Sequence, residues 1–593
     1  MTDRATEISS DTILDDVEHH FRIRAGPGAG KTYWLIGHIK SVLQTSQRLT
    51  PASRIGCISY TNVAVNGIRD RLGSAVDAVD VSTIHSFLYR NVVKPYLYLL
   101  RNEAGEELVK CADVDGHDEH RPRYDIVSAW IGRLKVDKLR GLFFQADHAK
   151  LFRELCRIAW DLVYKGGRWL VRGTRVTTLR NLSSQQIQNY KAMYWKRGDL
   201  DHEDVLYFAY RILDEHPLIR NFLSARFPYL FIDEFQDTNP VQTQVVKWLA
   251  ECGSVVGVIG DAEQSIYAFQ GAMRQDFLDF SVPGIRDYNI RNNRRSTDRI
   301  IELLNHVRGD GLHQVGHRNV SGEPVRVIVA DAAKSVSAVR KSLPEPETLY
   351  VLARKNQEVS RLRRQQSSTP TDLWEEFENV DSDRAHFFER LVTATEAARL
   401  GNITLALGEL LRGMWRRTGN ARRPLKCANG TTGLQRRGVA VSLLADLVTD
   451  YHRISSSTLF DVHARVANAV QSVRQDLSLT GIRNGKFAGF AKKTCYAELA
   501  AAVRLSDETR TVRTMHNAKG GQFDNVLVCL EAGTKTSGLD QLLTSDGSDD
   551  EERRVTYVAL SRAENRLFIS VPLLLDDHEQ QLRKLGVEVK RLS

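Results

Sequence analysis

Short apolar runs separated by a glycine-rich turn and a helical pattern open the chain. The run at 21–25 is apolar at alternate positions, which predicts a strand, and apolar residues recur at helical spacing over 33–43. Continuous apolar runs at 229–232 and from 254 onward are typical of strands buried on both faces. This succession predicts an α/β protein with a parallel sheet.

Composition places this pattern in a protein of several domains. The chain has 593 residues, too many for one compact core, and 42% of them are hydrophobic. No stretch approaches the roughly 18 uninterrupted apolar residues of a membrane span, and the first twenty residues are too polar for a secretory signal. The seven cysteines are scattered without a C-x-x-C spacing, which argues against a zinc or iron–sulfur site. We therefore expect a cytoplasmic protein with no membrane partner.

The net charge of +9 is a weak indication of a polyanionic partner. A solvated basic surface explains the charge equally well. Two basic clusters, at 164–175 and 415–423, suit duplex phosphates, although such runs are more often solvated faces.

The glycine-rich turn has the composition of a phosphate-binding P-loop. Small residues allow backbone amides to surround phosphate oxygens at the start of the following helix. Lys31 would reach the β and γ phosphates, and the hydroxyl of Thr32 would bind Mg²⁺. The residues expected around the phosphates are Ala25, Gly26, Pro27, Gly28, Ala29, Gly30, Lys31 and Thr32. The loop alone does not separate a kinase, a transporter, a GTPase and a motor, and a glycine turn without nucleotide is the plain alternative.

Two acidic residues directly follow the strand predicted at 229–232. Asp233 suits a metal contact and Glu234 suits polarisation of an attacking water. Gln264 follows the next buried strand, where an amide can contact a γ-phosphate and a neighbouring element. Tyr267 and Phe269 offer stacking faces for bases, although such residues are more often part of a core. A solvated pair of acids is the alternative for Asp233 and Glu234.

Nine segments together resemble the superfamily 1 helicases of the UvrD, Rep and PcrA type. They occur in the family's order, from residue 25 to residue 563. The segments are AGPGAGKT (25–32), SYTNVAV (59–65), STIHSF (82–87), DHEDVL (201–206), IDEFQD (232–237), GDAEQSIYAFQGA (260–272), NNRRST (292–297), TMHNAKGGQFDNV (514–526) and VTYVALSRA (555–563).

The resemblance implies two RecA-like P-loop domains with parallel sheets, each interrupted by a mainly helical insertion. The first domain would comprise 1–94 and 200–288, and the second 289–355 and 508–593. Strands of the second domain are expected at 324–331, 348–354, 511–516, 525–530 and 566–572. The insertions would be 95–199, with Trp130, Trp160, Trp169 and Trp195 in helical patterns, and 356–507.

The resemblance also implies roles for residues on both sides of a nucleotide cleft that holds ATP and Mg²⁺. Thr32 and Asp233 would hold the metal, Glu234 would activate water, and Gln264 would contact the γ-phosphate. Arg295 and Arg562 would come from the second domain to stabilise charge on the transferred phosphoryl group.

Single-stranded DNA is the expected polymer, because contacts to phosphates and base faces are tolerant of sequence. An RNA substrate is less expected. The residues implied are Thr61, Asn62, His85, Tyr267, Phe269, Thr514 and His516. For His85, a place in a core pocket is the alternative.

Three departures from the family pattern concern residues expected to bind the base and the ribose, and not the phosphates. No Leu-Asn-x-x-Gln segment precedes the P-loop. Arg294 stands where a tyrosine commonly stacks on the base, and a guanidinium plane can also stack. Gln522 stands where a glutamate usually binds the ribose. Separately, Gln270 replaces an arginine of the third motif.

The resemblance implies an ATP-driven translocase and helicase that moves 3′ to 5′ on single strands and acts at junctions with duplex. The rival hypothesis is a regulatory ATPase subunit that senses DNA or nucleotides for a partner nuclease, as in short UvrD-like proteins of anti-phage systems such as Gabija. The chain ends about thirty residues beyond Arg562, so we expect no fused nuclease.

Overall fold

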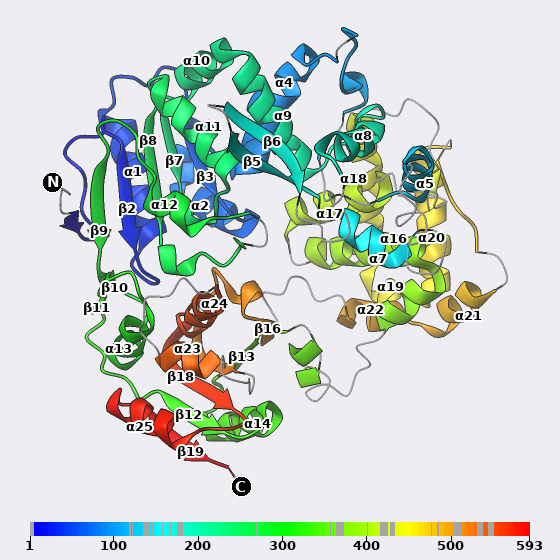
Figure 1. Cartoon of the computed structure of the whole chain (residues 1–593). Helices are drawn as coiled ribbons and strands as arrows, with labels where there is room; N and C mark the ends of the chain where they lie inside the picture. Colours follow the sequence, from blue (N-terminus) through cyan, green and yellow to red (C-terminus); the bar gives the residue numbers. More distant parts are fainter. Residues whose placement is uncertain are drawn as a thin grey trace. The chain divides into compact units, whose positions relative to one another are not determined.

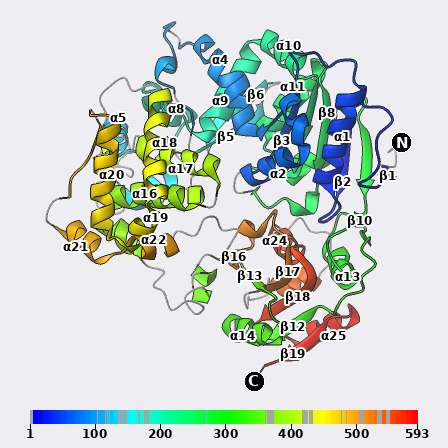
Figure 2. The same ribbon diagram turned by 180° about the vertical axis from the view of Figure 1, so that it is seen from behind.

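The computed structural model describes the chain from Ala5 to Leu592, apart from residues 103, 115, 118–119, 121, 135–142, 144–147, 157, 166–167, 175–181, 269–270, 356, 360, 363–372, 400, 416–424, 427–432, 476, 483–484, 503–510, 531–537 and 544–550. Two compact units form: one comprises Met1–Pro122, Ile126–Val359 and Val512–Ser593, and the other Arg123–Asp125 and Ser360–Thr511. Figure 1 labels their elements and Figure 2 shows them from behind. No described helix has the length and apolar character needed to span a membrane.

The first unit contains a seven-stranded sheet whose paired strands all run parallel. Its order is β1 (Thr6–Ile8), β9 (Arg286–Ile290), β2 (Phe21–Ala25), β8 (Val255–Gly260), β7 (Tyr229–Ile232), β3 (Ile55–Ser59) and β4 (Val79–Thr83). The strands predicted at 21–25, at 229–232 and from 254 onward are confirmed. Because the strands are parallel, their carboxyl ends share one edge, and ligands of open α/β sheets collect there.

Alternation along each strand supplies both faces of this sheet with core residues. Tyr229 and Phe231 join the cluster under α1 (Lys31–Thr45). Leu230 and Ile232 point to the opposite cluster, which includes α9 (His202–Glu215) and α11 (Pro240–Glu251). Successive side chains of a strand lie on opposite faces, so a sheet covered on both faces is apolar at every position.

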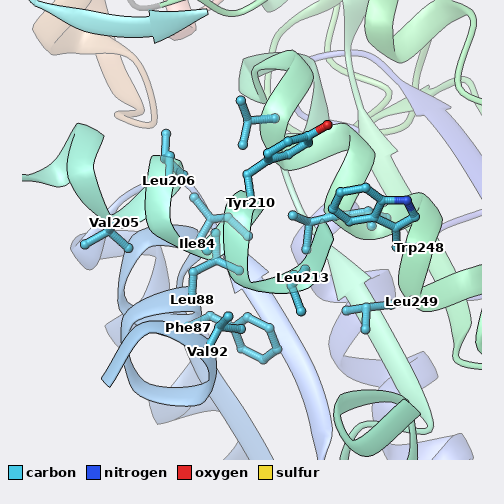
Figure 3. Packing of buried hydrophobic residues seen from close by; sticks show 14 of the residues in the cluster. Ile84, Phe87, Leu88, Val92, Val205, Leu206, Tyr210, Leu213, Trp248 and Leu249 are labelled. Atoms are coloured by element: carbon cyan, nitrogen blue, oxygen red, sulfur yellow. The ribbon is translucent and has the colours of Figure 1, made fainter. Parts of the chain in front are cut away.

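Figure 3 shows part of the cluster below α9 and α11. Tyr210 and Leu213 of α9 lie beside Trp248 and Leu249 of α11, with Leu206 farther along α9 near Val205, and the ring centroids of Tyr210 and Trp248 are 5.1 Å apart. This packing fixes the helices that flank β7, and with them the end of the strand that carries Asp233.

An antiparallel hairpin interrupts the region for which helix was expected. β5 (Ala159–Lys165) pairs with β6 (Arg168–Thr174), so the helical prediction is wrong for Trp160 and Trp169. Two short apolar runs with aromatic and β-branched residues, joined by Gly166-Gly167 in the sequence, are a hairpin signal that the helical interpretation overlooked. Helices α5 (Tyr124–Arg133) and α8 (Ser184–Trp195) confirm the prediction for Trp130 and Trp195.

A second parallel sheet of six strands lies in the same unit. Its order is β16 (Val512–Thr514), β13 (Leu349–Ala353), β17 (Phe523–Cys529), β18 (Ala563–Val571), β12 (Arg326–Val329) and β19 (Glu588–Arg591). Five of these strands were predicted. The edge strand β19 was missed, because a solvated Glu-Val-Lys-Arg run carries no apolar pattern.

The chain leaves the first sheet through a very short connection to a separate pair of strands. β9 ends at Ile290, and β10 (Asn292–Asn293) pairs in parallel with β11 (Val315–Gly316). Helix α13 (Asp298–Val307) follows and buries Ile300 and Leu304 in the core of the second sheet.

The second unit is mainly helical, as the pattern over 356–507 predicts. Its core is formed by α16 (Leu373–Arg399), α17 (Ile403–Trp415), α18 (Gly433–Thr449), α20 (Leu459–Val473), α21 (Lys486–Lys493) and α22 (Tyr496–Ala502). A short pair, β14 (Leu425–Lys426) with β15 (Ser478–Leu479), is the strand pairing described in this unit. Residues 416–423 of one predicted basic cluster lie outside the described residues.

Candidate nucleotide cleft and nucleic-acid interface

The turn between β2 and α1 presents backbone amides to an anion. Gly28 and Gly30 have φ of 71° and 81°, in the left-handed region that favours glycine. Gly30 caps α1, so the unpaired amides of the first helical turn face the loop. Lys31 is buried, and its Nζ lies 3.8 Å from Oε1 of Glu234. The turn between β2 and α1 therefore has the geometry expected of a phosphate-binding loop, and its lysine lies near Glu234, which follows β7.

Hydroxyl and carboxylate oxygens meet at the end of β7. Thr32 Oγ1 donates to Asp233 Oδ2 at 3.0 Å, and Asp233 is buried. Burial raises the pKa of Asp233, and the neighbouring charge of Glu234 raises it further. A group that relieves this unfavourable charge, such as a divalent cation, would therefore be favoured beside Asp233.

Glu234 is held in a costly backbone conformation. Its φ is 56°, which costs a non-glycine residue about 1 kcal/mol. Gln236 holds the carboxylate through its Nε2, and its Oε1 accepts the amide of Asp261 at 3.0 Å. Burial opposes ionisation of Glu234, but the charges of Lys31 and Lys519 outweigh it and lower the pKa of the carboxyl. Glu234 is thus a fixed carboxylate at neutral pH.

Gln264 connects the first sheet to the second. Its Nε2 donates to Asp261 Oδ2 at 2.8 Å, and its Oε1 accepts from Nη2 of Arg562 at 3.0 Å. Lys519 adds a second contact, donating through Nζ to the carbonyl oxygen of Gln264 at 2.6 Å and to Asp237 Oδ1 at 2.8 Å. The amide side chain therefore lies between groups from both sheets.

Arg295 and Arg562 are cations that bind only neutral oxygens among the described residues. Arg562 donates to the carbonyls of Val558 and Gly521 and to Gln264, and Arg295 donates to the carbonyl of Ser561 at 3.0 Å. Burial lowers the pKa of Arg562, and burial with the charge of Arg562 lowers the pKa of Arg295 to about 9. Two desolvated cations without an acidic partner favour the arrival of an anion.

Three further cations join the two sheets and were not assigned from the sequence. Lys519 is one of them, Arg308 donates to Asp261 Oδ1 at 3.1 Å, and Arg553 donates to Glu263 Oε2 at 3.1 Å. Lys519 lies within the quoted segment 514–526, three residues before Gln522, so that segment held a signal for it. No sequence signal marks Arg308, which follows α13 at a position without local pattern.

Arg294, one of the residues that depart from the family pattern, lies beside the P-loop together with Ser10. Arg294 donates its backbone amide to the carbonyl of Gly28 at 2.9 Å, and its guanidinium donates to Asp11. Ser10 is 2% exposed and packs against Gly30. Gln522 accepts from Nε of Arg295 at 3.0 Å.

The residues predicted to bind nucleic acid fall into two groups. Thr61 and Asn62 are exposed at the start of α2 (Asn62–Leu72), after β3, and His85 lies in α3 (Ile84–Leu88), after the neighbouring β4. Burial, with the charges of His202 and His117, lowers the pKa of His85 to about 3. A surface hollow of about 380 Å³ beside Asn62 is lined by Arg69, Ser86 and Arg90, among others. These donors suit a phosphate backbone.

The second group lies where the two sheets meet. Tyr267 stacks on Tyr60 with ring centroids 4.8 Å apart, and His516 lies 6.4 Å from the same ring. Thr514 is buried at the end of β16, and its hydroxyl accepts the amide of Asn517 at 3.2 Å. Phe269 and Gln270 lie outside the described residues. The Tyr267 ring is engaged by protein groups, so a base would have to join or displace this stack.

Two family models match the chain in the order of its two sheets. The model of the UvrD/REP helicase N-terminal domain matches residues 7–283, and that of the UvrD-like helicase C-terminal domain matches residues 487–573. The chain belongs to the UvrD-like helicases. Together the matches cover the P-loop, the carboxylates of β7, Gln264, Lys519 and Arg562.

Three UvrD-like relatives illustrate the extent of this similarity. The chain is 23% identical over 433 residues to the Gabija protein GajB of Bacillus cereus, 24% over 340 residues to the ATP-dependent DNA helicase Rep of Buchnera aphidicola, and 27% over 291 residues to the ATP-dependent DNA helicase PcrA of Bacillus subtilis. These alignments cover 65%, 53% and 48% of this chain. The chain spans 62%, 46% and 37% of the lengths of these relatives.

Proposed function

We propose that this UvrD-like chain is an ATP-driven translocase and helicase that moves 3′ to 5′ on single-stranded DNA and opens duplex at junctions. One observation carries the proposal: Arg562, which precedes β18 of the second sheet and has no ion pair among the described residues, donates to Gln264 of the first, and the charge of Glu234 acts on both Arg562 and Arg295. Such an arrangement hydrolyses a nucleotide only when both sheets contribute. The polarity rests on the family likeness.

In the proposed architecture each sheet belongs to a RecA-like domain. The first would comprise 1–94 and 200–288, the second 289–355 and 508–593, and the insertions 95–199 and 356–507. The hairpin of β5 and β6 then belongs to the first insertion. The helical second unit would supply the second insertion.

Each residue of the cleft has a proposed role in hydrolysis. The P-loop amides and Lys31 bind the β and γ phosphates, and the Glu234 carboxylate accepts a proton from the attacking water. Gln264 contacts the γ-phosphate. Arg295 and Arg562 stabilise the charge that develops on the transferred phosphoryl group, an effect worth about 10³-fold or more in rate. The ribose would lie against Gln522.

Thr32 and Asp233 fit a magnesium ion, because a hydroxyl and a carboxylate 3.0 Å apart beside a phosphate loop are the hard oxygen donors that Mg²⁺ prefers. When bound, the ion would neutralise phosphate charge and assist departure of the leaving group. Thr32 and Asp233 hold and orient it in this proposal.

DNA would contact Thr61, Asn62 and His85 beside the first sheet and Tyr267, Thr514 and His516 where the sheets meet. Phe269, which lies outside the described residues, joins this set through the family likeness alone. Tyr267 lies under Nζ of Lys519 at 4.8 Å, and Lys519 in turn binds the carbonyl of Gln264. A base that displaces Tyr267 from its stack would therefore disturb the group that holds Gln264. This path would couple DNA binding to hydrolysis.

Nucleotide hydrolysis by the purified chain, with and without single-stranded DNA, tests the proposal. We expect DNA to stimulate hydrolysis about tenfold or more, and Lys31→Ala to abolish it. Raising the salt concentration should weaken DNA binding, with a slope set by the phosphates neutralised. Hydrolysis that is indifferent to DNA would contradict a translocase.

The similarity to GajB over 65% of the chain favours one alternative, a regulatory ATPase that acts for a partner nuclease and unwinds little by itself. Strand separation by the isolated chain discriminates the two. A 3′-tailed duplex opened in the presence of ATP supports the helicase. Hydrolysis without opening, or opening only after a nuclease partner is added, supports the alternative.

A further inference from the structure

A tight turn over Ser9–Thr12 stands beside the P-loop and is fixed to α1. The amide of Thr12 donates to the carbonyl of Ser9 at 3.1 Å, and the amide of Ser9 donates to Oγ1 of Thr12 at 3.0 Å. Trp34 of α1 donates through Nε1 to the carbonyl of Thr12 at 2.9 Å. The turn therefore keeps its position relative to the helix whose first amides face the phosphates.

This turn and Arg294 border the phosphate loop on two sides. A Cβ placed on Gly30 would lie 2.9 Å from Cβ of Ser10, so Ser10 packs directly on the last glycine of the loop. Arg294 is joined to the loop through Gly28, and its side chain reaches Asp11 across the mouth of the loop. A nucleotide with its phosphates at Gly28–Gly30 that extends toward this side of the loop brings its base against Ser10, Asp11 and Arg294.

Two polar atoms in this border lack a partner among the described residues. Oγ of Ser10 and Nε of Arg294 are both buried, and neither makes a hydrogen bond there. A buried polar atom without a partner costs about 1–3 kcal/mol, so such atoms mark places where a ligand or water completes the bonding. Ser10 and Arg294 are thus positioned for a polar ligand rather than for a closed core.

The hydrogen-bonding groups of Ser10, Asp11 and Arg294 differ from those expected in a site that recognises adenine. Asp11 offers carboxylate oxygens, which only accept hydrogen bonds. The Watson–Crick edge of guanine presents two adjacent donors, N1–H and the N2 amino group, whereas adenine presents one donor beside an acceptor. The guanidinium plane of Arg294 can stack on either purine. The Asp11–Arg294 pair is 53% and 33% exposed at its side chains, so little free energy is lost when a base inserts.

We propose that Ser10, Asp11 and Arg294 form the nucleobase site and that Asp11 makes it accept guanine nucleotides at least as well as adenine nucleotides. Asp11 acts as the specificity-determining residue, through two hydrogen bonds from the guanine edge. The inference rests on the proposed nucleotide site and deepens it.

Competition between GTP and ATP tests the inference. Hydrolysis of each is followed with single-stranded DNA present, and binding of each is measured separately by displacement of a fluorescent adenine nucleotide. We expect kcat/KM for GTP to equal or exceed that for ATP. Asp11→Asn, which replaces one acceptor by a donor at the same size, should lower the preference for GTP over ATP about tenfold in both measurements.

Asp16→Asn is the matched control, because Asp16 also forms an exposed ion pair, with Arg286 at 3.1 Å, away from the loop. It should leave the preference unchanged. Turnover of ATP with GTP more than a hundredfold weaker would overturn the inference, as would an unchanged preference in Asp11→Asn. A chain that hydrolyses neither nucleotide refutes the proposed function, while the displacement measurement still decides the inference on base selectivity.

Discussion

Two buried groups of charges in the first unit are arranged in opposite ways. Around α8 and α9, the Nζ of Lys191 pairs with Asp201 and, at 3.0 Å, with Oδ1 of Asp204. In the nucleotide cleft, Arg562 is buried and Arg295 is half-buried, but their described hydrogen bonds go to neutral oxygens. The first group contains its own acidic partners, whereas neither arginine of the second forms an ion pair among the residues that the structure describes.

The pKa shifts follow this difference. Burial would lower the pKa of Lys191, but the charges of Asp201 and Asp204 outweigh burial and raise it. Burial lowers the pKa of Arg562 and Arg295, and no acid compensates fully. A balanced buried group contributes to the fold once it is formed, while an unbalanced one remains costly until an anion binds. The comparison teaches which buried charges belong to function.

The largest expected effect follows from removing a cation of the unbalanced group. Arg562→Ala should lower kcat for nucleotide hydrolysis about 10³-fold, because the charge of the transferred phosphoryl group loses its partner. Nucleotide affinity should change little. Without nucleotide, the Tm should stay the same or rise, since a desolvated charge is removed.

Arg566→Ala controls for loss of an arginine near the same strand, because Arg566 is paired with the acidic Glu323 at 2.6 Å and with Glu347. Its kcat should match that of the wild-type chain. A large fall in Tm for Arg562→Ala, with kcat reduced only in proportion to the folded fraction, would assign Arg562 to the fold instead.

Glu234→Gln tests the carboxylate that is proposed to accept the proton in the same cleft. The amide keeps the size of the side chain but cannot accept a proton from water, so kcat should fall about 10²-fold with nucleotide binding retained. Single-turnover hydrolysis and nucleotide displacement measure the two quantities. Normal turnover in this variant would remove Glu234 as the base.

Lys191→Met tests the balanced group and should behave in the opposite way. The variant leaves Asp201 and Asp204 buried without their cation, which should lower the free energy of unfolding by about 3 kcal/mol in urea. Hydrolysis per folded molecule should be unchanged.

Lys110→Met is the control, because it removes a lysine from an exposed ion pair with Asp113 at 2.6 Å. It should lower the free energy of unfolding by less than about 1 kcal/mol. Equal losses of unfolding free energy in Lys191→Met and Lys110→Met would show that the burial of Lys191 does not increase its contribution to stability.

The smallest effect concerns His38, a buried base whose ring nitrogens have no hydrogen-bond partner among the described residues. His38 packs against Phe21 and Trp34, and burial lowers its pKa to about 3. The unfolded chain takes up the proton near the ordinary value of about 6.5, so stability is full above that pH and is lost as the pH falls below it. Between pH 6 and pH 5 the loss should be about 1 kcal/mol.

His38→Leu should remove the share of this loss that His38 causes, about 1 kcal/mol, while His85, whose pKa burial also lowers, keeps its own share. Urea unfolding at the two pH values measures the change. Replacement of the exposed His317 by Leu should leave the whole loss in place. A pH dependence that is unchanged in His38→Leu would assign the effect to other buried groups.

The sequence predicts those parts of the molecule in which local pattern and chemistry coincide. Strands buried on both faces, such as Tyr229–Ile232, are apolar at every position, and a glycine turn before Lys31 admits few interpretations. The helical second unit follows from periodicity. These features are local, so one chain segment carries all of the information.

The remaining features depend on contacts between distant segments. Arg308 binds Asp261, 47 residues away, and Ser10 packs on the loop without any signature of its own. The hairpin containing Trp160 was mistaken for helix, because short apolar runs fit both periods. Pairing of residues across the cleft is a property of the folded chain, and no spacing in the sequence encodes it.

The connection between β9 and β10 has a mechanical consequence. Only Arg291 separates the sheet with the P-loop from the segment with Asn293, so the backbone path between them is about one residue long. A Cβ on Gly28 would lie 2.5 Å from Oδ1 of Asn293, which shows how closely the two segments are packed. A connection this short cannot extend. Any rotation of the β10–β11 pair relative to the first sheet must therefore appear as a torsional change at Arg291 or as movement of the phosphate loop itself.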